Sequence, residues 1–224
     1  MANLYVEDGN YPSAKEIVNR FLEKNPENSY ASDMFRLLHT PDVYVAFLLI
    51  NQGEMEKASG LLRQFLQKNP RNTDALLGLG SIYFHQEMYE DASDSYCQVL
   101  AQQPRSEEAQ YYLAKILSIQ GRWEDALDFM ESQQFAEQDS APLLKLRIEL
   151  YIQAGQHNLA EAAIRHYLGK YPEDIEIYLI AGNFDYQMGN KTGSKEKFLQ
   201  VLRLDPYNEL ARENLNIILN ELGE

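Results

Sequence analysis

Residues 73–106 read TDALLGLGSIYFHQEMYEDASDSYCQVLAQQPRS. In each half of this stretch, apolar residues recur every three or four positions, as they do along one face of a helix. They are Leu76, Leu79 and Tyr83 in the first half, and Ala92, Tyr96 and Val99 in the second. Pro104 follows the second segment, and proline cannot continue a helix. The stretch therefore predicts two helices joined by a turn near residues 87–89, and not strands, whose period is two.

These features recur along the chain with a period of 34 residues. Small residues stand at Ala58, Ala92, Ala126, Ala160 and Ser194. Prolines stand at Pro70, Pro104, Pro172 and Pro206, with Gln138 in the remaining slot. Glycines stand at Gly53, Gly121, Gly155 and Gly189, with Glu87 in the remaining slot. Because a small residue lets two helices pack closely and glycine suits the turn between them, the three columns predict repeated helix pairs. A simple four-helix bundle would not require these three columns to share one period.

A 34-residue helix–turn–helix unit with these residues in this order resembles the tetratricopeptide repeat. The resemblance covers nearly the whole chain and implies an all-α fold, a right-handed α-solenoid of stacked helix pairs. We expect one domain over residues 1–224. Its parts are a partial repeat at 1–28, an insertion at 29–38, full repeats at 39–72, 73–106, 107–140, 141–174 and 175–208, and a terminal helix at 209–224.

Two regions depart from the pattern. The insertion at 29–38 is apolar enough to predict a short extra helix. Between residues 130 and 148, Gln133 and Gln138 replace an apolar residue and the proline, and Ile148 stands where the helices should approach closely. A side chain of this size predicts that the helix pair around Ile148 is pushed apart, and simple drift of a degenerate repeat is the alternative interpretation.

Composition excludes several classes of protein. The net charge of −14 over 224 residues would repel a polyanion, so we expect no nucleic-acid partner. Cys97 is the only cysteine, which excludes a disulfide scaffold. No apolar stretch reaches the roughly 18 residues of a membrane span, so no membrane insertion is expected. The N-terminus shows no signal peptide, which predicts a cytoplasmic protein. An excised fragment of a longer secreted or membrane-attached protein is the alternative.

The sequence offers no constellation for catalysis. The four histidines show no metal-ligand spacing, and Gly78-Leu79-Gly80 lies inside a predicted helix and lacks the third glycine of a dinucleotide-binding loop. We therefore expect no catalytic residues, no metal, no cofactor and no enzyme activity.

The resemblance implies a concave face lined by the first helix of each repeat, and such faces bind protein segments. Transferred position by position, the predicted peptide-binding groove consists of Phe47, Ile50, Leu77, Ser81, Phe84, Tyr111, Lys115, Lys145, Glu149, Leu179, Asn183 and Tyr186. Its aromatic members are anchors of the kind that dominate interfaces, although each could instead pack against a neighbouring first helix.

Some members of the family clamp a C-terminal carboxylate with lysines and asparagines on this face. Lys115 and Lys145 are present here, but Leu77 and Gly78 stand where polar residues would be needed. The sequence therefore predicts a scaffold or adaptor that binds a peptide or protein segment by other means. The alternative is a structural, self-assembling or regulatory module of a longer multidomain protein, including a homo-oligomer.

Overall fold

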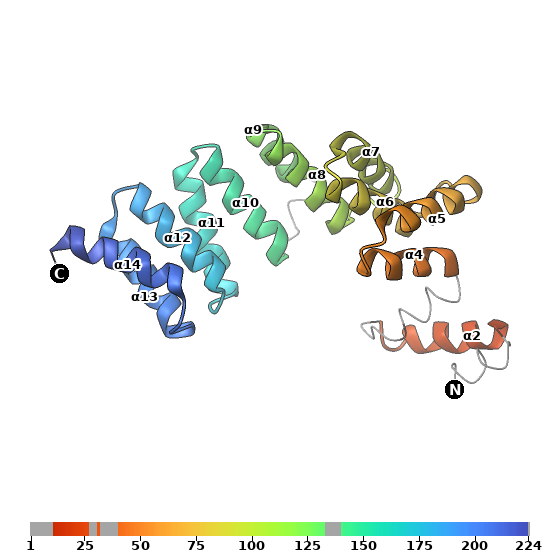
Figure 1. The fold of residues 1–224 in the computed structure, drawn as a ribbon, viewed down its shortest axis with the longest axis horizontal. Coiled ribbons are helices and arrows are strands. Elements are labelled where there is room, and N and C mark those ends of the chain that lie inside the picture. Colours follow the sequence, from red (N-terminus) through yellow and green to blue (C-terminus); the bar gives the residue numbers. More distant parts are fainter. Residues whose placement is uncertain (1–10, 27–30, 32–39, 133–139, 224) are drawn as a thin grey trace. The chain divides into compact units, whose positions relative to one another are not determined.

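The computed structural model describes residues 11–26, 31, 40–132 and 140–223, and every regular element in these ranges is a helix (Figure 1). The helices are α2 (Tyr11–Leu22), α4 (Pro41–Asn51), α5 (Met55–Lys68), α6 (Thr73–His85), α7 (Tyr89–Leu100), α8 (Glu107–Ile119), α9 (Trp123–Glu131), α10 (Ala141–Gln153), α11 (His157–Lys170), α12 (Ile175–Gln187), α13 (Lys191–Leu204) and α14 (Glu209–Leu222). The all-α class predicted from the sequence is confirmed. The extra helix expected at 29–38 lies almost wholly outside the described residues, as do Gln133 and Gln138.

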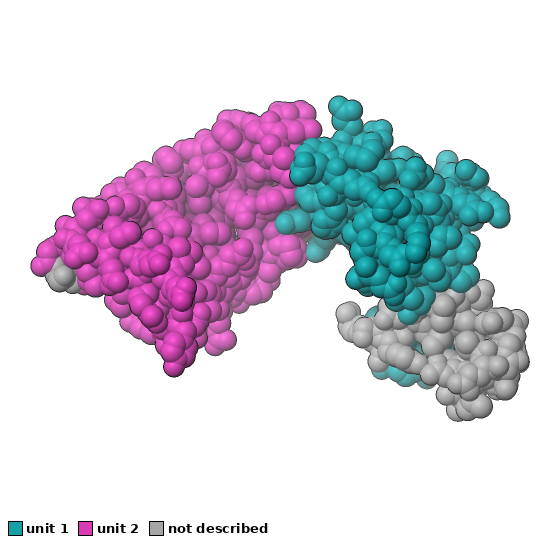
Figure 2. All heavy atoms as spheres, in the orientation of Figure 1, with its two compact units in different colours: residues 1–113 teal, residues 114–224 magenta. Residues whose placement is uncertain are grey.

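Helices of one kind begin at a constant interval. The first helices α6, α8, α10, α12 and α14 begin at residues 73, 107, 141, 175 and 209, and the second helices α5, α7, α9, α11 and α13 begin at 55, 89, 123, 157 and 191. The chain divides into two compact units, unit 1 at residues 1–113 and unit 2 at residues 114–224 (Figure 2). The expectation of one domain with the repeat boundaries given above stays a prediction.

The small-residue column lies at the centre of the helix pairs. Ala58, Ala92, Ala126, Ala160 and Ser194 have no exposed surface. The hydroxyl of Ser194 donates a hydrogen bond of 2.7 Å to the carbonyl oxygen of Gly182 on the facing helix, so its burial leaves no polar group unpaired. Two of the pairs also carry a glycine against an aromatic ring. A Cβ atom at Gly80 would lie 2.8 Å from the ring of Tyr96, and one at Gly182 would lie 2.9 Å from the ring of Phe198.

The pair α10–α11 has different side chains at these two positions. Ile148 occupies the place of Gly80 and is fully buried, and its counterpart on the second helix is Ile164 in place of an aromatic residue. The separation of this pair predicted from Ile148 stays a prediction, with drift of a degenerate repeat as the alternative.

The turns between paired helices use the left-handed region of the backbone. Gly53, Gly121, Gly155 and Gly189 have φ between 68° and 79°. Glu87 occupies the same place in the α6–α7 turn with a φ of 60°. Such a conformation costs an L-residue with a Cβ atom roughly 1 kcal/mol, whereas glycine adopts it freely. The α6–α7 turn is thus strained where the other turns are not.

A further column, not recognised from the sequence, determines where first helices begin. Asn72, Asp174 and Asn208 each precede a first helix and accept a hydrogen bond from the backbone amide three residues later. These residues are 34 residues, or a multiple of 34, apart. Side-chain oxygens at this position satisfy amides that the helix itself leaves unpaired, and each such cap stabilises a helix by about 1 kcal/mol.

Candidate functional site

The twelve side chains predicted to line a groove all retain contact with solvent. Six lie in unit 1 (Phe47, Ile50, Leu77, Ser81, Phe84 and Tyr111) and six in unit 2 (Lys115, Lys145, Glu149, Leu179, Asn183 and Tyr186). Each unit therefore presents a first-helix face of its own, and their joint role as one binding groove stays a prediction.

The aromatic residues of unit 1 support one another. The ring of Tyr112, which the sequence analysis did not select, lies 4.9 Å from the ring of Phe84 and 5.3 Å from that of Tyr111, both in edge-to-face contact. Tyr112 also stacks in parallel on the buried ring of Tyr96 at 5.1 Å. Phe47 and Ile50 pack at the margin of the core formed by α4, α5 and α6. Phe84 and Tyr111 thus pack against Tyr112 and keep part of their surface exposed, and their role in binding stays a prediction.

Unit 2 has a hollow of about 490 Å³ on its first-helix face, referred to below as the first-helix hollow. Its apolar lining comes from Trp123 of α9, Ile152 of α10, and Ile180 and Phe184 of α12. Around these lie three carboxamides, Gln153, Asn183 and Gln187, together with Ser118 and Glu149. Apolar walls with a few polar groups that can both donate and accept hydrogen bonds are typical of sites that bind an uncharged side chain and the peptide backbone beside it.

Two of the predicted groove residues come together in an ion pair beside this hollow. The Nζ of Lys115 on α8 lies 3.0 Å from Oε2 of Glu149 on α10. Both side chains are about a third exposed, at 31% and 38%, so water screens the attraction and the pair contributes little to stability. The pair neutralises the charge of Lys115 on the first-helix face.

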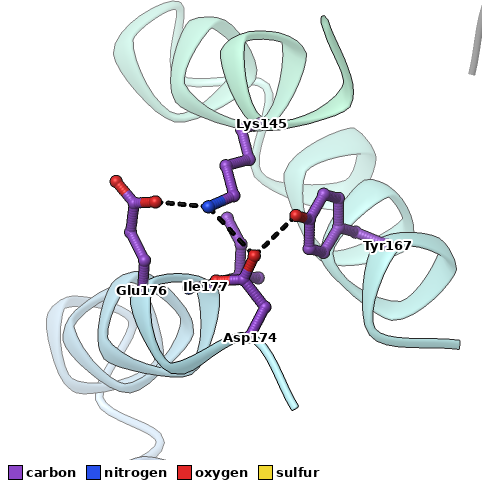
Figure 3. A network of polar contacts seen from close by, with 5 residues as sticks. All are labelled: Lys145, Tyr167, Asp174, Glu176 and Ile177. Atoms are coloured by element: carbon purple, nitrogen blue, oxygen red, sulfur yellow. Dashed lines mark hydrogen bonds and ion pairs between the residues drawn. The ribbon is translucent and has the colours of Figure 1, made fainter. Parts of the chain in front are cut away.

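Lys145 is neutralised more completely (Figure 3). From α10 it points toward the start of α12, where its Nζ lies 2.9 Å from Oδ2 of Asp174 and forms a second ion pair with Glu176. Burial alone would lower the pKa of Lys145, but the hydrogen bonds to Glu176 and Asp174 prevail and raise it. Lys145 therefore stays charged and connects α10 to α12.

Asp174 is the centre of this network (Figure 3). The hydroxyl of Tyr167 on α11 donates to Oδ2 at 2.6 Å, and the backbone amide of Ile177 donates to Oδ1 at 3.2 Å. Burial would raise the pKa of Asp174, but the hydrogen bonds from Tyr167 and Lys145 lower it below its usual value. Burial together with the bond to this carboxylate raises the pKa of Tyr167 to about 12. The network joins three consecutive helices, and its charged groups already have partners within the protein. It therefore fits a structural role better than the binding of a ligand.

Two further predicted residues, Asn183 and Tyr186, lie on α12 and contact α14. The hydroxyl of Tyr186 donates to Oε1 of Glu221 on α14 at 2.7 Å, and Lys191 lies 3.0 Å from the other oxygen of the same carboxylate. Asn183 accepts a hydrogen bond of 3.4 Å from Asn214. Polar contacts thus connect α12 to α14 along the first-helix face, and Ile217 of α14 is half exposed beside them.

Within the described ranges, no three His, Cys, Asp or Glu side chains are close enough to hold a metal ion. Among the helices described, none combines the length and the apolar character that crossing a membrane requires.

Comparisons with known proteins agree with the repeat pattern. A family model described as the tetratricopeptide repeat matches residues 48–98 and 87–139. No curated protein matches the sequence.

Solved structures are similar over longer ranges. A tetratricopeptide repeat protein from Parabacteroides merdae is 17% identical, with 98% of this chain and 96% of that chain covered and a TM-score of 0.55. YrrB, described as a TPR protein with an unusual peptide-binding site, is 18% identical with 89% and 97% covered and a TM-score of 0.63. MamA from Desulfovibrio magneticus RS-1 is 19% identical with 74% and 93% covered and a TM-score of 0.66. At such identities the likeness is one of fold. The chain thus matches the tetratricopeptide repeat over residues 48–139, and its 34-residue helix pairs continue the same helical-repeat fold beyond them.

Proposed function

We propose that this protein is an interaction scaffold or adaptor that binds a peptide or protein segment on its first-helix face. The observation that carries the proposal is the first-helix hollow of unit 2, in which apolar side chains lie among uncharged carboxamides. Solenoids of this class bind partners on the face lined by first helices, and the protein YrrB is described as having a peptide-binding site.

The charges on this face indicate what kind of segment binds. Lys115 and Lys145 are the lysines that could have held a terminal carboxylate, and both are already paired with acidic side chains of the protein itself. An acidic ligand would have to break these pairs, whereas an apolar side chain would not. We therefore expect the ligand to be an internal segment with an apolar anchor, and not a free C-terminus.

The proposal is tested by selecting peptides from a displayed random library on the immobilised chain and measuring their affinities in solution. Ile152→Asp places a charge in the apolar lining of the first-helix hollow. Leu159→Asp is the matched control, because Leu159 is 48% exposed on α11 and lines no part of this hollow. Selected peptides should bind Ile152→Asp about tenfold or more weakly, which is about 1.4 kcal/mol, and should bind Leu159→Asp as they bind the wild type. Equal loss in both variants, or no enrichment of peptides, would contradict the proposal.

Self-assembly is the second candidate, and the surface of α14 favours it. Leu210 and Ile217 are each 50% exposed on this helix, and Tyr207 just before it is exposed as well. Exposed apolar side chains of this kind are found at interfaces between subunits. Light scattering over a range of protein concentrations distinguishes the two functions, because a homo-oligomer gains mass with concentration and a monomeric adaptor does not. The cytoplasmic location and the absence of a nucleic-acid partner stay predictions.

A further inference from the structure

Unit 2 contains a second hollow, of about 510 Å³, between α11, α12 and α13. It differs from the first-helix hollow in being lined by the second helices α11 and α13 as well as by α12, and the two hollows share only Phe184 of α12. Ile164 and Leu168 of α11 and Tyr178 of α12 make its lining partly apolar. We propose that this second-helix hollow receives the side chain of a lysine or arginine from a protein partner.

The hollow lies where α12 and α13 carry smaller side chains than α6 and α7 do at the corresponding positions. Leu79 and Tyr83 of α6 pack against the preceding helix pair. At the corresponding places, α12 has Ala181 and Asp185. On α13, Gly193 stands where other second helices carry Asp91, Asp125 or Leu159. A space of several hundred cubic ångströms is within the range of sites that take a small ligand or an anchor side chain.

Asp185 gives the hollow its chemical character. Its side chain is half-buried, and Oδ1 accepts a hydrogen bond of 3.1 Å from the amide of Asn190. Oδ2 accepts no hydrogen bond in the described part of the chain and lies beside Gly193, where a Cβ atom would first meet the side-chain amide of Asn190 and then Oδ2 at 2.9 Å. The missing side chain at position 193 leaves room for both groups, and a guanidinium or ammonium group is the ligand that best satisfies Oδ2.

The other charges around the hollow leave an excess of negative charge. Glu161 and Arg165 of α11 neutralise each other at 2.6 Å. On α13, Glu196 and Lys197 line the wall, and Lys197 forms no ion pair with Asp185 within the described ranges. Asp185, Glu196 and Lys197 together carry a charge of −1, so the site attracts a cation, and its apolar lining can accept the aliphatic stem of lysine or arginine.

The charge requirement is tested with n-butylguanidinium, a mimic of the arginine side chain, and n-butylurea, its uncharged isostere. Titrations of the ¹⁵N-labelled full chain are followed at the amide signals of Gly169 and Gly193, which line this hollow and not the first-helix hollow. Butylguanidinium should shift both signals saturably and bind about fivefold more tightly than butylurea, the effect of one partly exposed ion pair.

Two variants and a control complete the experiment. Asp185→Asn retains a hydrogen-bond acceptor for Asn190 and should make the two compounds bind equally. Ala181→Leu should fill the hollow and abolish the shifts for both compounds. Asp128→Asn, which removes an exposed carboxylate on α9, should change nothing. Equal binding of the two compounds to the wild type, or an unchanged preference in Asp185→Asn, would overturn the proposal. Because the readout lies on α11 and α13, its failure is independent of peptide binding to the first-helix hollow.

Discussion

The helix pairs α6–α7 and α10–α11 begin at the same positions of the 34-residue repeat but have different interiors. In the first pair, Gly80 lies against the ring of Tyr96, and in the second, Ile148 and Ile164 take their places. All four positions are buried in the core. The two pairs therefore fill the same two positions with different side chains, and Ile148 and Ile164 together are bulkier than Gly80 and Tyr96.

The largest loss of stability is expected when isoleucine is placed at only one of these two positions in the α6–α7 pair. Gly80→Ile drives a side chain into the ring of Tyr96, which already lies 2.8 Å from where a Cβ atom would be. The free energy of unfolding in urea should fall by about 3 kcal/mol. The double variant Gly80→Ile/Tyr96→Ile should recover part of this loss. Gly60→Ile is the control, because a Cβ atom at Gly60 would meet nothing within 4 Å. If the double variant recovers none of the lost free energy of unfolding, the two side chains do not share one space, which would contradict this account.

Ala92→Leu tests the small-residue column of the first pair. Ala92 has no exposed surface, so three added carbons overpack the contact between α6 and α7. We expect the free energy of unfolding to fall by about 2 kcal/mol. The exposed neighbouring change Glu90→Gln should have almost no effect. Equal melting temperatures of these two variants would be incompatible with the repeat register.

The α10–α11 pair also differs from the α6–α7 pair in being followed by a charged N-cap residue, Asp174, at the start of α12. Asp174→Asn removes the ion pair with Lys145 and weakens the bond from Tyr167, which should cost about 1.5 kcal/mol at pH 7. The pKa of Asp174 is lowered in the folded state, so its carboxylate stabilises the fold above the unfolded pKa of about 3.9. This contribution is lost as the pH falls through the lowered value. Urea unfolding at a series of pH values should therefore show the two proteins converging only in acid, and a gap that closes near neutral pH would refute this account.

The smallest expected difference in stability between the two pairs comes from the turns that join their helices. Glu87 has a left-handed backbone in the α6–α7 turn, where the α10–α11 turn has Gly155. Glu87→Gly should raise the free energy of unfolding by about 1 kcal/mol, and Gly155→Ala should lower it by a similar amount. Thermal unfolding of both variants measures this pair of effects, whose signs must be opposite.

The sequence predicted the fold because three kinds of residue recur in phase. The cap column of Asn72, Asp174 and Asn208 has the same period and could have been read in the same way. The second-helix hollow could also have been suspected from the sequence, since Ala181 and Asp185 stand where the α6 repeat has the larger apolar residues Leu79 and Tyr83.

Other features could not be predicted. The pairing of Lys145 with Asp174 and Glu176 depends on the distance between consecutive repeats, which the spacing of residues does not give. The central position of Tyr112 depends on which way neighbouring rings turn, and the sequence pattern does not contain this.

The proposal that the protein binds a peptide on the first-helix face is tested most directly by hydrogen exchange with and without a selected peptide. The peptide should slow exchange at residues 145–153 and 180–187, the parts of α10 and α12 that line the first-helix hollow, and should leave residues 89–100 of α7 unchanged. The same peptide should give no protection in Ile152→Asp. Protection confined to α11 and α13, or protection that persists in Ile152→Asp, would show that the peptide binds elsewhere and would contradict the proposed function.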